Sequence, residues 1–185
     1  MFIQTETTPN PSTLKFIPGE TVMASGTVNF TSKAEAVTSP LANALFAITD
    51  VKAVFLGNDF ITVTKSDDKG WDVLKTEVLT TIMEHFISGQ PIIGEGAAVK
   101  KADTSNDDDD EIVKQIKELI DTRVRPSVAQ DGGDIIFRGF ANGVVLLEMH
   151  GSCSGCPSST VTLKNGIETM LKHYIPEVEA VEAVD

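Results

Sequence analysis

The chain has 185 residues, of which 41% are hydrophobic, and it carries a formal net charge of -12 at pH 7. A chain this acidic is not expected to bind nucleic acid, because it cannot neutralise the phosphate backbone. It also lacks an apolar run long enough to span a membrane, so we expect no membrane segment.

The start of the chain and its cysteines bear on the cellular compartment. No charged stretch followed by an apolar one, as in a signal peptide, opens the sequence, and no arginine precedes Arg123, unlike in a transit peptide. The two cysteines have no further cysteine to pair with, which is typical of a reducing compartment. We therefore expect a bacterial cytoplasmic protein or a mature organellar one.

Residues 1–93 are expected to form a small α+β domain. A Pro-Asn-Pro turn around Asn10 joins two short strands, and Ser39 and Gly89 are placed to cap one helix and to end another. The predicted strands and helices that follow the turn are strands 26–30, 52–56 and 60–64 and helices 40–48 and 71–87. This half holds no cysteine and one histidine, His85, so we expect no catalytic constellation in it.

Residues 94–110 differ in composition from the segments on either side. They contain almost nothing that could enter a hydrophobic core, and they end in four consecutive aspartates, 107–110. Such a segment is typical of an acidic flexible linker. A run of like charge is more often solvated than a cation site, although the last carboxylates are well placed to cap a following helix.

Residues 111–185 are expected to form a second domain with the order α-β-β-α-β. A helix with an apolar stripe begins at 111 and should end near Pro126, because proline breaks helices. The remaining elements are strands 135–137, 144–149 and 178–184 and helix 157–173, with an Asn-Gly hairpin at 142–143. The fold class is thus α+β, with two small α/β-sandwich-like domains joined by the linker.

The only two cysteines form a C-x-x-C motif, Cys153 and Cys156, between a buried strand and a helix. The motif allows three interpretations: part of a metal or cluster site, a redox dithiol, or two inert buried thiols. The Gly/Ser loop favours chemistry over inert burial, because small residues let a bulky group approach the backbone. Pro157 places Cys156 near the helix N-cap, where the helix terminus stabilises a thiolate.

The number of ligands limits the metal interpretation. Structural zinc takes four ligands and iron–sulfur clusters normally take four cysteines, yet this chain supplies two. His150 could add a nitrogen, but a half-exposed histidine that points away from the site is the simpler expectation. Otherwise, four thiolates require two chains related by a two-fold axis through the metal. A thiol-disulfide oxidoreductase and a zinc-stabilised interaction module remain the alternatives.

The cysteine region closely resembles the C-terminal domain of the NifU-like (Nfu) iron–sulfur cluster carriers. The matching residues are Asp-Gly-Gly-Asp at 131–134 and segments 143–147, 151–160 and 162–168. The other half resembles the Nfu N-terminal domain in segments 8–11, 15–16, 39–42 and 60–65. With two cysteines, the chain cannot contain the additional cysteine-bearing domains of the longer nitrogen-fixation proteins.

The resemblance implies a function that composition and periodicity do not indicate. It implies a carrier, not an enzyme, that holds a 4Fe-4S cluster between two subunits through Cys153 and Cys156. The implied partners are apo iron–sulfur proteins as acceptors, an upstream assembly scaffold as donor, and a second copy of the chain. The family allows a bacterial cytoplasmic protein or, in a eukaryote, one of the mitochondrial matrix.

Overall fold

A computed structural model describes residues 2–94 and 110–184. The predicted linker, 94–110, therefore lies almost wholly outside the described residues. Within them, no helix has both the length and the apolar content that crossing a membrane requires.

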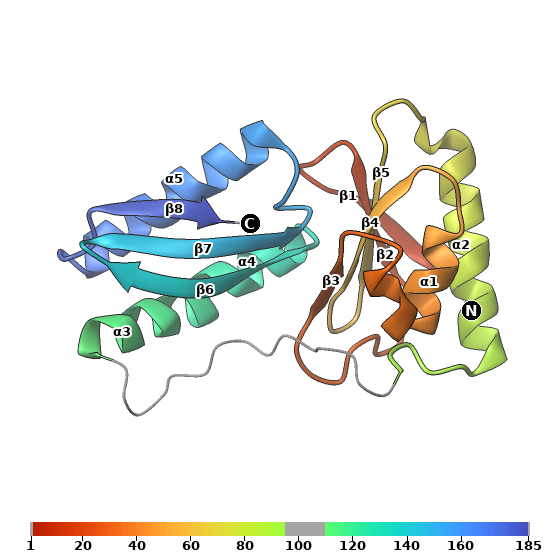
Figure 1. Ribbon diagram of the computed structural model, residues 1–185, viewed down its shortest axis with the longest axis horizontal. Coiled ribbons are helices and arrows are strands. Elements are labelled where there is room, and N and C mark those ends of the chain that lie inside the picture. Colours follow the sequence, from red (N-terminus) through yellow and green to blue (C-terminus); the bar gives the residue numbers. More distant parts are fainter. Residues whose placement is uncertain (1, 95–109, 185) are drawn as a thin grey trace.

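The N-terminal part is a five-stranded antiparallel sheet with helices on one face (Figure 1). Its elements are strands β1 (Gln4–Thr7), β2 (Thr13–Ile17), β3 (Val28–Phe30), β4 (Val51–Leu56) and β5 (Ile61–Lys65), the 3-10 helix η1 (Glu35–Thr38), and helices α1 (Pro40–Phe46) and α2 (Trp71–Ser88). The strand order is β1-β2-β5-β4-β3. The predicted caps are confirmed: the Ser39 hydroxyl accepts from the Ala42 N–H, and Gly89 ends α2 at a φ of 67°.

Alternation along the strands divides the sheet into two faces. One face carries apolar side chains that pack against α1 and α2 in a single hydrophobic cluster, and its members include Leu14, Phe16, Val54, Leu56, Ile61 and Val63. The other face carries Lys15, Phe55 and Thr62, which point away from the helices. Figure 1 shows that this second face is turned toward the C-terminal part of the molecule.

The C-terminal part is a three-stranded sheet with its helices packed on one hydrophobic cluster. Its elements are α3 (Glu111–Leu119), η2 (Ile120–Val124), α4 (Arg125–Gln130), β6 (Gly133–Ala141), β7 (Val144–Gly151), α5 (Pro157–Tyr174) and β8 (Ala180–Val184). Central strand β7 is antiparallel to β6 and parallel to β8. The α+β class and the α-β-β-α-β order are confirmed.

Two predicted boundaries in this part are wrong. The first helix does not stop at Pro126, because η2 is a turn of π-helix in which the Arg125 N–H bonds to the Ile120 carbonyl, and α4 continues beyond it. A wider turn accommodates a proline that would clash with a regular α-helix. Strand β6 is longer than predicted because it begins at Gly133, opposite Gly151, and passes a register shift between Phe137 and Gly139.

Candidate functional site

The candidate site is the loop from the end of β7 to the start of α5. The β7 strand ends at Gly151, whose φ of 64° turns the chain. The next residue fixes the loop to the turn before β6: the Ser152 N–H donates to the Gly132 carbonyl at 3.1 Å, and the hydroxyl donates to the Asp131 carbonyl at 2.5 Å. The loop therefore starts from a rigid base.

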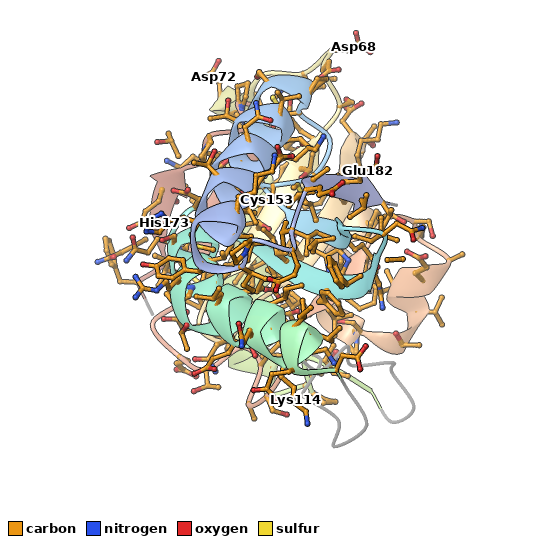
Figure 2. All side chains as sticks on the ribbon, turned by 90° about the vertical axis from the view of Figure 1, so that its left-hand side faces the viewer. Asp68, Asp72, Lys114, Cys153, His173 and Glu182 are labelled. Atoms are coloured by element: carbon orange, nitrogen blue, oxygen red, sulfur yellow. The ribbon has the colours of Figure 1, made fainter. Side chains whose placement is uncertain are left out.

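Cys153 is seated in the interior and is only 5% exposed. Its sulfur lies over Gly133, where an added Cβ would be 2.4 Å from Sγ. Burial raises the pKa of the Cys153 thiol to about 12. The residue lines a cavity of about 360 Å³ that Pro9 of the N-terminal domain also lines. In Figure 2, viewed from the side of the C-terminal domain, Cys153 lies beside α5.

Cys156 occupies a different environment at the start of α5. It is the N-cap residue, as predicted, with Pro157 in the first helical turn. The Ser158 hydroxyl, 3.3 Å from the sulfur, and then the Ser159 hydroxyl and N–H lower the pKa of the Cys156 thiol to about 7. A substantial fraction of Cys156 is therefore thiolate at neutral pH, the form that binds metal.

The two sulfurs do not share a cavity. Cys153 lines the cavity described above, whereas Cys156 lines another of about 340 Å³ together with Val161 and Val184. Gly155 lies just before Cys156 with a φ of 78° and open space where a side chain would be. Glycine has wider backbone freedom than other residues, so Gly155 is the position in this loop at which the backbone between the two cysteines can most readily change conformation.

His150 is not the half-exposed residue expected from the sequence. It is 2% exposed, its Nε2 lies 2.5 Å from Glu148 Oε1, and its ring meets the Phe55 ring at a centroid distance of 6.3 Å. Alternation along β7 places His150 on the face opposite Met149, which packs in the core, and the N-terminal domain buries His150 there through Phe55. In residues 2–94 and 110–184, no group of three or more His, Cys, Asp or Glu side chains could hold a metal ion.

Several residues that support the loop lie in segments that resemble the Nfu family, but the sequence does not indicate their contacts. The turn aspartate Asp134 is buried and forms an ion pair with Arg125, with Nε 3.1 Å from Oδ1. Asn10 and Lys15 of the N-terminal domain donate to carbonyl groups of the C-terminal domain. The sequence predicts a turn at Asn10, in a segment that resembles the Nfu N-terminal domain, but nothing near it in the sequence indicates its distant partner.

Comparison with known proteins identifies the family. Residues 3–89 match the family described as "Scaffold protein Nfu/NifU N terminal", and residues 116–182 match the "NifU-like domain". The chain is 53% identical over its full length to the human protein named "NFU1 iron-sulfur cluster scaffold homolog, mitochondrial", of which it covers 72%. The chain belongs to the Nfu family.

Other Nfu proteins are similarly related. "NifU-like protein 5, mitochondrial" of Arabidopsis thaliana is 54% identical over 98% of this chain and 67% of its own length. A solution structure of a NifU-like protein from Saccharomyces cerevisiae aligns with 51% of this chain and 86% of its own, at 25% identity and a TM-score of 0.47. Both curated relatives are named as mitochondrial proteins, so they give no support to the cytoplasmic alternative.

Proposed function

We propose that this Nfu protein is an iron–sulfur cluster carrier that receives a 4Fe-4S cluster and passes it to apo-proteins. Cys153 and Cys156 are the proposed ligands. The observation that carries the proposal is the placement of both thiols in a Gly/Ser loop at a helix N-terminus, in a family named for scaffold proteins. The cluster is cargo, and the chain acts on it as a carrier and not as an enzyme.

The two thiols would enter the ligand set in different ways. Cys156 is available as a thiolate near neutral pH, so it is the first ligand to bind incoming iron. Cys153 holds its proton in a buried site and must release it when its sulfur joins the iron, since metal binding displaces protons from thiol ligands. The order of binding is thus Cys156 and then Cys153.

Ligand counting supports a cluster shared between two chains. Four thiolates are normally needed, each chain offers two, and the described part of one chain brings no third candidate to the site. A two-fold axis through the cluster supplies the other pair from a second copy. An acceptor's thiolates could then displace the ligands stepwise, beginning with Cys156, which is the more exposed of the two cysteines.

The domains and partners follow from the same reasoning. We propose that 1–93 and 111–185 are separately folding domains joined at 94–110, which the two distinct hydrophobic clusters support. The cluster comes from an upstream scaffold and goes to apo iron–sulfur proteins. In a eukaryote the protein acts in the mitochondrial matrix. This proposal is supported by the curated relatives, which are named as mitochondrial proteins.

Anaerobic loading followed by transfer tests this function. Loaded protein should be brown and oxygen-sensitive, and it should restore activity to an apo-enzyme that needs a 4Fe-4S cluster. The Cys156→Ala and Cys153→Ala variants should each fail to load. A colourless protein that instead cycles between dithiol and disulfide would contradict the proposal and favour a thiol-disulfide oxidoreductase.

A further inference from the structure

The second face of the N-terminal sheet is buried although it carries polar residues. Lys15 is 8% exposed and Thr62 is 1% exposed, and both lie on the face turned away from α1 and α2. Phe55 and Phe60 are buried on the same side but belong to neither hydrophobic cluster. A face that alternates with the core face and carries lysine and threonine would normally be solvated. Here the C-terminal domain covers it.

Asn10 contacts the cysteine loop itself. Its Nδ2 donates to the carbonyl oxygen of Ser154, which lies between the two cysteines, at 3.1 Å. Its Oδ1 accepts from the Ser12 N–H at 3.0 Å, which fixes the side chain within its own turn. The amide is therefore held in place by one end, and its free end is directed at the loop.

Lys15 makes a second contact beside the loop. Its Nζ donates to the carbonyls of Ala129 and Gln130, at 3.2 and 3.0 Å, where α4 ends. The last turn of a helix leaves carbonyls without intrahelical partners, and Lys15 supplies a donor there, although the Ala129 carbonyl also accepts from the Gly132 N–H at 3.1 Å. The ammonium also lies 4.8 Å from the centre of the Phe60 ring. The ammonium also pairs with Glu6 Oε2 of its own domain at 3.5 Å, and because the lysine is buried, loss of the carbonyl contacts would leave its charge with fewer partners.

The two domains also pack closely around these polar contacts. The Thr27 hydroxyl donates to Asp134 Oδ2 at 2.8 Å, so the buried ion pair of the C-terminal domain is completed from the N-terminal one. An added Cβ at Gly132 would lie 2.7 Å from Thr62 Cγ2. The residues that contact the N-terminal sheet thus surround the base of the cysteine loop.

We propose that this sheet face, with the Asn10 turn, is a binding surface for the cysteine loop of its own chain. The surface holds the loop in the arrangement in which the two thiols line different cavities. Pro9 borders the cavity of Cys153, so the N-terminal domain narrows the approach of a second chain to that sulfur while the domains are in contact. We further infer that the domains must separate before two cysteine loops can share a cluster. This inference rests on the proposed function.

Hydrogen exchange of the full-length apo-protein tests the surface without any cluster. The Asn10→Asp variant keeps the oxygen that accepts from Ser12 and replaces the donor to Ser154 with a carboxylate oxygen, which repels that carbonyl. The Asn43→Asp variant makes the same change at an exposed position of α1 and serves as the matched control. Amides of residues 151–156 should exchange about fivefold faster in Asn10→Asp, as expected for the loss of one hydrogen bond.

A second pair of variants repeats the comparison at the lysine. Lys15→Met should accelerate exchange of the same amides by about tenfold or more, because a charged donor is lost, whereas Lys52→Met, at an exposed position of β4, should not. Equal exchange in the interface variants and their controls would overturn the proposed surface.

The rate of cluster loading tests whether contact between the domains opposes loading. Asn10→Asp should take up the cluster faster than Asn43→Asp, and equal rates would overturn the claim that domain contact opposes loading. If the wild-type chain and every variant fail to load, the proposed function fails, while the exchange comparison still decides the surface.

Discussion

The sulfur of Cys153 lies directly over Gly133, so closely that a Cβ on the glycine would come within 2.4 Å of it. The same Cβ would meet the His150 carbonyl at 2.9 Å. Gly133 is thus required for close packing and not for a positive φ. This pair links Gly133, the first residue of β6, to Cys153, one of the two proposed ligands.

We expect Gly133→Ala to destabilise the protein by about 1–3 kcal/mol, because the added methyl overpacks a rigid site. Urea unfolding of the apo-protein measures the change. Gly166→Ala is the control, since Gly166 lies in the interior of α5 with open space around it and alanine should stabilise the helix there by about 0.5–1 kcal/mol. Equal effects of the two substitutions would contradict the packing argument.

The thiols should differ in their reactivity with iodoacetamide. The rate at Cys156 should rise with pH and reach half its maximum near the pKa of about 7, because the thiolate is the nucleophile. Cys153 should remain unmodified through pH 8, since its pKa is raised to about 12. Peptide mass spectrometry resolves the two sites, and faster modification of Cys153 would contradict the assignment.

A hydroxyl variant tests the cause of the low pKa. Ser158→Ala removes the first donor to the sulfur, which should raise the pKa of Cys156 and slow its alkylation at pH 7. Ser158→Thr keeps a hydroxyl at the same position and should retain most of the rate. Identical pH profiles for the alanine variant and the wild type would show that the hydroxyl does not stabilise the thiolate.

The buried ion pair at the base of β6 should contribute strongly to stability. Asp134→Asn leaves the Arg125 charge without its buried partner and should cost about 3 kcal/mol in unfolding free energy. Asp121→Asn removes the exposed partner of the same arginine and should cost less than about 1 kcal/mol. Comparable losses in the two variants would show that burial does not decide the energetics here.

Local patterns predicted most elements and the environment of one cysteine. The Asn-Gly hairpin is confirmed by positive φ angles at Asn142 and Gly143, and the N-cap position of Cys156 follows from Pro157. These features depend on neighbours in the sequence, so spacing and residue type reveal them. The fold class and the order of elements could be predicted for the same reason.

Contacts between distant segments could not be predicted in this way. The burial of Cys153 depends on Gly133 and on the fold of the whole C-terminal domain, and the partner of Asn10 lies 144 residues away. The predicted end of the helix at Pro126 is wrong because a π-turn accommodates the proline, and no local signal in the sequence marks that turn. The periodicity of apolar residues shows which face of a helix or strand is apolar, but it does not show which distant segment packs against that face.

The central claim is that one cluster joins two chains, each contributing Cys153 and Cys156. Sedimentation of the loaded full-length protein, combined with iron and sulfide analysis, tests it most directly. We expect loading to convert monomers into dimers with about four irons and four sulfides per two chains. A loaded monomer that holds a complete cluster would contradict the shared site and require ligands from outside the C-x-x-C motif.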